Sequence, residues 1–379
     1  MESNRKQKTI HSSKSSNDSW LGNMTRKMTP FERFIASSNR EEPDQIPAMP
    51  YCTGPFISRF SNLKVSEYYL DAKKKLEAQL TVLKHFPGVM FYNGVWPDEG
   101  VVVEASAFGC NVVWSDTSPP WIEQRIIIQP KDVDKLRIPD PHKNGYMPLM
   151  LEHLKYMKQN VSEEIKRDYG YIDGVGYSIG PTDIAGLLRG FSDFMADFIL
   201  NPELVKELLD FTTEAVIAWL EAQQEIVGEF RWFAIADDYP GLVSREHFQK
   251  FCFPCLKHIF NHFCGIRVFH IDSHTNHILD LLPETGANVL FGFSTEVDLA
   301  VAKKKIGDRM CLAGNVPPLE VLASKTPREV EDTCRKLIEI GKPRGYILTS
   351  GGTTTADTPP QNIDAMIKAA EKYGRIKTC

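Results

Sequence analysis

The chain has 379 residues, of which 42% are hydrophobic and 25% are charged, and its formal net charge at pH 7 is −5. This balance predicts a soluble globular protein, and the lack of a basic surplus argues against nucleic-acid binding. No apolar run approaches the ~20 residues that a membrane span needs, and the first residues lack the apolar segment of a signal peptide. Eight scattered cysteines are typical of free thiols in a reducing compartment, so we predict a cytoplasmic protein.

Residues 1–27 are rich in Ser, Lys, Asn and Arg and poor in apolar side chains. Such a segment cannot bury enough apolar surface to offset the entropy of ordering it, so we expect a disordered tail. The pattern changes at Met28, because Thr29 can cap a helix that begins at Pro30. We therefore predict one folded domain over residues 28–379.

Short apolar runs that are typical of buried strands recur along this domain, near residues 47, 89, 173, 232, 266, 288, 310 and 345. Helical patterns separate most of them, chiefly over 65–86, 183–188, 190–199, 202–227, 244–264, 278–282, 327–341 and 359–373. Alternating strands and helices predict a parallel sheet, and eight strands favour a closed (β/α)8 TIM barrel over a doubly wound sheet. No Gly-x-Gly-x-x-Gly follows any of these strands, which weighs against dinucleotide binding.

The strongest chemical signal lies between Gly265 and His277, where a buried strand ends in a cluster of titratable side chains. In a barrel, the carboxyl ends of the strands form the mouth that carries the active site. We expect Glu104 to reach the same mouth from an insertion at 101–114, either a hairpin or a short helix and strand. The strand ends themselves bring further polar residues there: Tyr51, Cys52, Asn93, Tyr177, Ser178, Asp237, Asp238, Ser294, Glu296, Asn315, Thr349 and Ser350.

Two pairs within this set suit catalysis or metal binding. His270 and Asp272 are two residues apart and share a strand face, which suits a divalent metal or an acid/base pair. The alternative is that Asp272 only caps the following helix. Of the tandem acids Asp237 and Asp238, one could face the cavity as base or ligand, or one could cap the next helix while the other is solvated.

Two further motifs have plainer explanations beside the functional ones. The glycine-rich loop 351–360 follows the eighth strand, where barrels often bind phosphate, and Thr358 could cap the next helix; a simple turn is the alternative. The pair Cys252 and Cys255 lies inside a helical segment without a second pair. We therefore expect core cysteines there rather than a zinc or redox site.

A series of soft motifs, in order over residues 28–375, resembles the uroporphyrinogen decarboxylase superfamily. That superfamily contains the decarboxylases and the corrinoid-linked methyltransferases. The resemblance rests on Met28–Phe34, Glu42–Pro47, Glu104–Gly109, Gly180–Pro181, Leu188–Gly190 through Asn201–Pro202, the tandem acid before Ser244, the strand that ends at His270, Ala313–Pro318 and Thr358–Asn362.

Departures from the family pattern narrow what the resemblance implies. The decarboxylases carry an arginine-rich segment after the first strand, whereas residues 51–60 contain Arg59 alone, and Asp98 is out of register with the decarboxylase aspartate. The thiol-methylating members bind zinc through His-x-Cys and a later Cys. Here His270 is kept, but Asp272 and Gly352 stand at the two cysteine positions. Losing these soft ligands favours a harder metal or none.

The resemblance therefore implies a corrinoid-dependent methyltransferase that moves a methyl group between a small substrate, such as an ether or amine, and a corrinoid carried by a partner protein. In this scheme His270, Asp272 and Glu104 hold a metal or polarise the leaving heteroatom, and Asp237 or Asp238 orients the substrate or acts as an acid. Substrate-binding roles fall to Tyr177, Glu104, Glu296, Asn315 and Asn93. A decarboxylase-like lyase and a non-catalytic corrinoid- or porphyrin-binding barrel are the alternatives, and a homodimer is compatible with each.

Overall fold

Six parallel strands form the wall of the fold in the computed structural model, which describes residues 27–98 and 100–376. Each strand pairs with the next one along the chain. Their positions confirm six of the eight predicted strands: β3 (Val175–Ile179), β4 (Trp232–Ala236), β5 (Ile266–His270), β6 (Val289–Phe291), β7 (Cys311–Val316) and β8 (Tyr346–Ser350). The predicted disordered tail falls, except for Lys27, outside the described residues.

The first predicted strand is reduced to a single bridge beside β8. Ala48 pairs with Leu348 in a parallel bridge, flanked by the bonds from Met49 N to Leu348 O (2.8 Å) and from Leu348 N to Pro47 O (2.9 Å). Pro47 and Pro50 have no N–H to donate, which limits the length of a ladder here. The segment still occupies the first position of the barrel wall, because it continues the sheet past β8.

The second predicted strand, residues 89–93, is wrong: no strand forms there, and residues 92 and 93 lie in a bend. One backbone bond, from Tyr92 N to Pro50 O (3.2 Å), joins this segment to the first one, and tyrosine side chains join it to the rest of the wall. Phe91 N donates to the hydroxyl of Tyr171 (2.7 Å), which donates in turn to Phe91 O (3.2 Å), and the hydroxyl of Tyr177 donates to Tyr92 O. The gap between the first segments and β3 is therefore closed by side chains.

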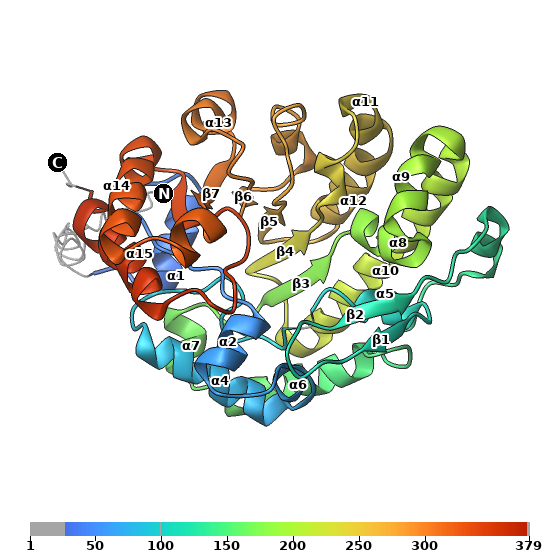
Figure 1. The fold of residues 1–379 in the computed structure, drawn as a ribbon, viewed down its shortest axis with the longest axis horizontal. Coiled ribbons are helices and arrows are strands. Elements are labelled where there is room, and N and C mark those ends of the chain that lie inside the picture. The colour runs from blue at the N-terminus through green and yellow to red at the C-terminus, as the bar shows by residue number, and fades with distance from the viewer. Residues whose placement is uncertain (1–26, 99, 377–379) are drawn as a thin grey trace, which may run out of the picture.

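Helices surround the strands, as Figure 1 shows. Their bounds are α1 (Pro30–Ser38), α2 (Gly54–Phe60), α3 (Val65–Leu70), α4 (Ala72–His85), α5 (Val103–Ala107), α6 (Met147–Asn160), α7 (Glu163–Asp168), α8 (Pro181–Arg189), α9 (Phe191–Leu200), α10 (Pro202–Val227), α11 (Arg245–His247), α12 (Phe253–His262), α13 (Leu299–Ile306), α14 (Pro327–Gly341) and α15 (Pro360–Tyr373). Together with the parallel strands they confirm the α/β class and the TIM-barrel arrangement.

Short elements fill the connections. The insertion at 101–114 is a helix and strand as one prediction had it, because α5 precedes an antiparallel pair of strands. The remaining elements are β1 (Asn111–Val113), β2 (Trp121–Gln124), 3-10 helices over Pro130–Lys135, Tyr239–Gly241 and Leu282–Thr285, and π-helices over Phe248–Cys252 and Pro318–Ala323.

Two helix predictions are wrong in detail. The helix expected over 65–86 is broken at Asp71, whose carboxylate caps α4 by accepting from Lys73 N and Lys74 N. The helix expected over 278–282 consists of turns that lead into the 3-10 helix at Leu282, and Pro283 prevents a longer α-helix.

Other predictions hold. Thr29 and Glu32 form a reciprocal capping box at the start of α1. Cys252 and Cys255 are buried, as expected of core cysteines. Within the described ranges, no helix has both the length and the apolar character needed to cross a bilayer.

The tyrosine closure can be tested by Tyr171→Phe. The change leaves the buried N–H of Phe91 without its acceptor, so we expect a loss of about 1–3 kcal/mol in unfolding free energy, measured by urea denaturation. Tyr169→Phe is the matched control, because its hydroxyl accepts from the exposed Gly88 N and not from a buried N–H. Equal stability of the two variants would contradict this role of Tyr171.

Candidate metal and substrate site

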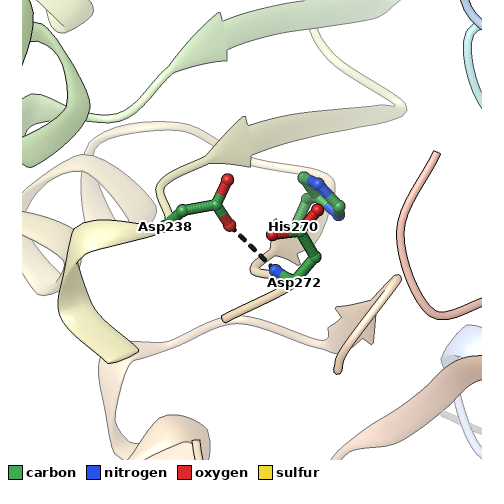
Figure 2. A group of neighbouring side chains, drawn as sticks. All are labelled: Asp238, His270 and Asp272. Atoms are coloured by element: carbon green, nitrogen blue, oxygen red, sulfur yellow. Dashed lines mark hydrogen bonds between the residues drawn. The ribbon is translucent and has the colours of Figure 1, made fainter. Parts of the chain in front are cut away.

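Three potential metal ligands meet where β4 and β5 end. Asp238 follows β4, His270 ends β5, and Asp272 comes two residues later. The two strands are in register, with Ala236 opposite His270, so their carboxyl ends coincide. One donor atom from each side chain lies within 4.8 Å of the other two, as seen in Figure 2. We call Asp238, His270 and Asp272 the triad.

The ring of His270 is held so that one nitrogen is free to bind. Its Nδ1 contacts the backbone oxygen of Phe291 at 3.0 Å, and because a carbonyl can only accept, Nδ1 carries the proton. Nε2 is then the lone-pair nitrogen. Such a backbone contact is the usual way to orient a metal-binding imidazole. The ring of Tyr51 packs edge-on against that of His270, with centroids 5.1 Å apart.

The two carboxylates of the triad are close enough to disfavour simultaneous negative charge. Asp238 Oδ1 accepts the backbone N–H of Asp272 at 2.8 Å. Partial burial and the neighbouring Asp238 raise the pKa of Asp272 to about 6, and His270 opposes this shift. A site of this kind favours a shared proton or a bound cation. The triad therefore has the electrostatic character of a cation site.

Asp237 faces away from the triad and has a structural role. Its Oδ1 accepts from the hydroxyl of Thr182 (2.5 Å) and the backbone N of Asp183 (2.8 Å), so it caps the start of α8. Asp183 in return accepts from Asp238 N at 2.9 Å. Burial raises the pKa of Asp237 to about 6. The two neighbouring acids therefore have different roles. Asp238 faces the site, and Asp237 caps α8, a helix that precedes it in the chain and not the next helix that the plainer interpretation named.

A cavity of about 280 Å³ adjoins the triad through Tyr51, which lines the cavity and packs against His270. Aromatic rings and two acids dominate its wall. The lining residues are Tyr51, Thr53, Pro55, Tyr69, Tyr92, Asn93, Trp96, Asp98, Gly100, Val101, Glu104, Pro119, Tyr177, Ser178, Ile179, Ala236 and Thr353. Three of the predicted substrate-binding residues, Asn93, Tyr177 and Glu104, are among them.

Glu104 is presented to this cavity by the short helix α5. Its Oε1 accepts from the Ser178 hydroxyl and from Ile179 N, both at 2.9 Å. Its Oε2 is buried without a hydrogen-bond partner among the described residues. Burial raises the pKa of Glu104 to about 7, although the hydrogen bonds act in the opposite direction. Glu104, predicted as the third ligand beside His270 and Asp272, is not part of this cluster, in which Asp238 takes the third place.

The other two predicted substrate-binding residues do not line the cavity. Asn315 is buried, but its amide donates to Ser294 O (3.1 Å) and Val297 O (2.8 Å) and so braces the loop after β6. Glu296 is exposed, and its Oε2 lies 3.8 Å from Nδ1 of His274. Position at a strand end was a sound guide to location, but it could not show which way each side chain points.

The glycine-rich loop 351–360 closes one side of the site. A Cβ on Gly352 would lie 3.3 Å from Asp272 Oδ2, so this backbone abuts the triad. Thr353 lines the cavity, and Thr354 N donates to Tyr51 O at 3.0 Å. The predicted Thr358 cap is wrong, because α15 begins after Pro359 and the Thr358 hydroxyl contacts that of Thr355 (3.1 Å).

Tyr69, Trp96 and Asp98 are among the lining residues that sequence reasoning missed. Tyr69 lies on α3 and the other two lie in the irregular segment before α5, so none follows a predicted strand directly. In the sequence, Asp98 drew attention only because it is out of register with the aspartate of the decarboxylases. The sequence did offer one signal for these residues. The stretch between residues 51 and 96 is richer in Phe, Tyr and Trp than the chain as a whole, which is 10% aromatic.

Comparisons with known proteins agree on one family. The sequence profile of the family "Uroporphyrinogen decarboxylase (URO-D)" matches residues 29–373. The methylcobamide:CoM methyltransferase MtbA of Methanosarcina acetivorans is 24% identical over 353 residues, covering 91% of this chain and 98% of that protein. The uroporphyrinogen decarboxylase of Methylobacillus flagellatus is 28% identical over 279 residues, covering 69% of this chain and 74% of the relative.

A solved structure supports the fold. The methyltransferase from Methanosarcina mazei superposes with a TM-score of 0.79 at 23% identity, covering 91% of this chain and 99% of that one. At this identity the likeness shows the fold alone.

The buried state of Glu104 predicts a characteristic pH dependence of stability. The folded protein keeps the Glu104 proton up to about pH 7, whereas the unfolded chain loses it near the ordinary 4.5. Rising pH therefore favours unfolding across this window, by up to about 3 kcal/mol. Glu104→Gln removes this contribution, so its stability relative to the parent should rise between pH 5 and pH 8 in thermal denaturation. The exposed Glu296→Gln should follow the parent, and a parallel course for Glu104→Gln would refute the assignment.

Proposed function

The chain belongs to the uroporphyrinogen decarboxylase family, and within it we propose a corrinoid-dependent methyltransferase that moves a methyl group between a small substrate and a corrinoid protein. The observation that carries the proposal is the triad beside a small aromatic cavity. Full-length similarity to a relative named as a methylcobamide methyltransferase supports it. The corrinoid enters as the second substrate, held by a partner protein, and methyl donors such as ethers or amines fit the cavity.

The residues of the triad fit a divalent metal. One imidazole nitrogen and two carboxylates form a donor set of intermediate hardness, suited to ions such as Zn²⁺, Co²⁺ or Mn²⁺. The backbone contact of His270 aims its ring, and a cation would relieve the repulsion between Asp238 and Asp272. When bound, such an ion supplies Lewis acidity to a heteroatom of the substrate.

The other residues orient the substrate and exclude water. Tyr51 spans the triad and the cavity, so a molecule against its ring lies within reach of both. Glu104 lines the cavity, has a buried carboxyl oxygen without a hydrogen-bond partner among the described residues, and changes protonation near neutral pH. It can act as a proton donor to a leaving oxygen or as the counter-charge to a cationic nitrogen.

The cavity argues against the decarboxylase alternative. A porphyrinogen with eight carboxylates needs many basic contacts and a large site. The described lining contains no Lys or Arg, and the volume is about 280 Å³. Arg59, the only arginine in its segment, is exposed and pairs with Asp357.

Metal analysis tests the triad. We expect protein purified without chelator to hold about one divalent metal per chain, and Asp272→Ala or Asp238→Asn to lose it, as measured by mass spectrometry of the metal content. Glu104→Gln is the control for a nearby buried carboxylate and should keep the metal. Loss in Glu104→Gln but not in Asp238→Asn would restore the ligand set predicted from sequence.

Methyl transfer itself can be followed with free cob(I)alamin as acceptor. We expect the absorbance of methylcobalamin to grow with a suitable ether or amine, and Asp272→Ala to lower the rate at least a hundredfold while circular dichroism stays unchanged. Normal turnover in Asp272→Ala would remove Asp272 from the mechanism. Release of CO2 from an acid substrate without methyl transfer would favour the lyase alternative.

A further inference from the structure

Resting on the proposed methyl transfer, we infer that the methyl donor is a quaternary ammonium cation, seated in the aromatic cavity beside the triad. This goes beyond the general class of ethers and amines, and it follows from the wall of the cavity alone. Three features carry it: the arrangement of the rings, the charge of the lining and the carboxyl oxygen that lacks a partner.

Five aromatic side chains line the cavity, and four of them form a continuous series of ring contacts. Tyr51 packs edge-on against Tyr92 (5.0 Å between centroids), Tyr92 against Tyr177 (5.5 Å), and Trp96 tilts against Tyr177 (5.1 Å). Tyr69 completes the lining from α3. Electron-rich faces of Tyr and Trp attract cations, and cages of such rings are the usual way in which proteins hold quaternary ammonium groups. We call these five residues the cage.

The cavity around the cage is lined by acidic side chains and by no described basic side chain. Asp98 and Glu104 both line it, each less than a tenth exposed. Asp98 Oδ2 accepts the Tyr68 hydroxyl at 2.8 Å, and Lys75 sits behind it, with Nζ 3.2 Å from the backbone oxygen of Asp98. Lys75 is not part of the lining, so its charge offsets Asp98 without facing the ligand.

Glu104 is the acidic residue that would favour a cationic substrate over a neutral or anionic one. Its Oε2 is buried and unpaired in the described structure, which is costly unless a ligand compensates it. A quaternary ammonium offers no N–H, and therefore needs what the cavity provides: rings to surround its methyl groups and acidic residues in the same lining. A neutral aryl ether would use the rings but leave Glu104 uncompensated. An anionic substrate would be repelled.

The chemistry is balanced without a proton donor. The C–N bond breaks with both electrons remaining on nitrogen, and the methyl carbon receives the electron pair of the Co(I) corrinoid to form a C–Co bond. The leaving group is a neutral tertiary amine, so no acid is required. The triad is then free to hold an oxygen substituent of the same molecule, since Tyr51 and Tyr92 lie 5.1 and 6.1 Å from the His270 ring, centroid to centroid.

Calorimetry with a charged probe and its neutral isostere tests the inference. Choline and 3,3-dimethylbutan-1-ol have the same shape and differ in one central atom and its charge. We expect choline to bind at least tenfold more tightly, and tetramethylammonium to compete with it. Equal affinity of choline and the alcohol, or no binding of either cation, would overturn the inference.

Substitutions at Tyr51 test whether its ring or its hydroxyl binds the ligand, and a substitution at Glu104 tests whether the charge of this residue matters. Tyr51→Leu should weaken choline binding at least fivefold, whereas Tyr51→Phe keeps the ring and should retain most of the affinity. Glu104→Gln should weaken choline but leave the alcohol unaffected. Trp121→Leu is the control, because Trp121 is 46% exposed and outside the cage. Circular dichroism checks folding, and equal losses for Tyr51→Phe and Tyr51→Leu would contradict the cage.

The result can be separated from that of the proposed function. Methyl transfer to cob(I)alamin from anisole, with no binding of choline or tetramethylammonium, would leave the methyltransferase proposal standing and refute the ammonium cage. Tight choline binding without methyl transfer from any ether or ammonium donor would support the cage and refute the methyltransferase.

Discussion

One hydrogen bond holds the site together: the backbone N–H of Asp272 donates to Asp238 Oδ1. It ties the end of β4 to the loop that leaves β5, and so places two carboxylates against one imidazole. Asp237 supports this contact indirectly. It caps α8 by accepting the N–H of Asp183, and the carboxylate of Asp183 accepts in turn the backbone N–H of Asp238. The loop is therefore fixed by acids that bind backbone N–H groups. Only Asp238 and Asp272 are left facing each other, and their mutual repulsion is what makes a cation favourable there.

Gly352 lies beside the triad, at one of the two positions where the family resemblance places a cysteine. Its backbone lies against Asp272 Oδ2, where a third ligand from the loop after β8 would have to sit. Its φ of +116° is one that L side chains rarely adopt. A cysteine at this position would need a different loop conformation. The absence of cysteine at positions 272 and 352 is thus linked to the backbone, and we propose Asp238 as the third donor.

The sequence was informative where periodicity and strand ends decide the structure. Continuous apolar runs located β3 to β8, and the strand-end rule found His270, Asp272 and the pair Asp237 and Asp238. It failed where a side chain replaces a backbone partner: nothing in residues 89–93 shows that Tyr171 will accept the N–H of Phe91. The sequence also could not show which way a side chain points. Asn315 and Glu296 both follow strands, but the side chain of Asn315 binds the loop after β6 and that of Glu296 is exposed to solvent.

The cage is the least predictable part because its members come from separate elements whose relative placement only the fold sets. Tyr51 follows the first segment, Tyr69 lies on α3, Trp96 precedes α5, and Tyr177 lies on β3. Each ring alone is an ordinary core residue. Four of the five rings of the cage contact one another in series, and Glu104, whose second oxygen has no described partner, lines the same cavity; we propose that together they form a site for positive charge. Tyr51 lies between this cavity and the triad. In the proposed function the substrate is held by its charge in the cage and by an oxygen atom at the triad, and these two contacts would fix which methyl group points to the mouth of the barrel.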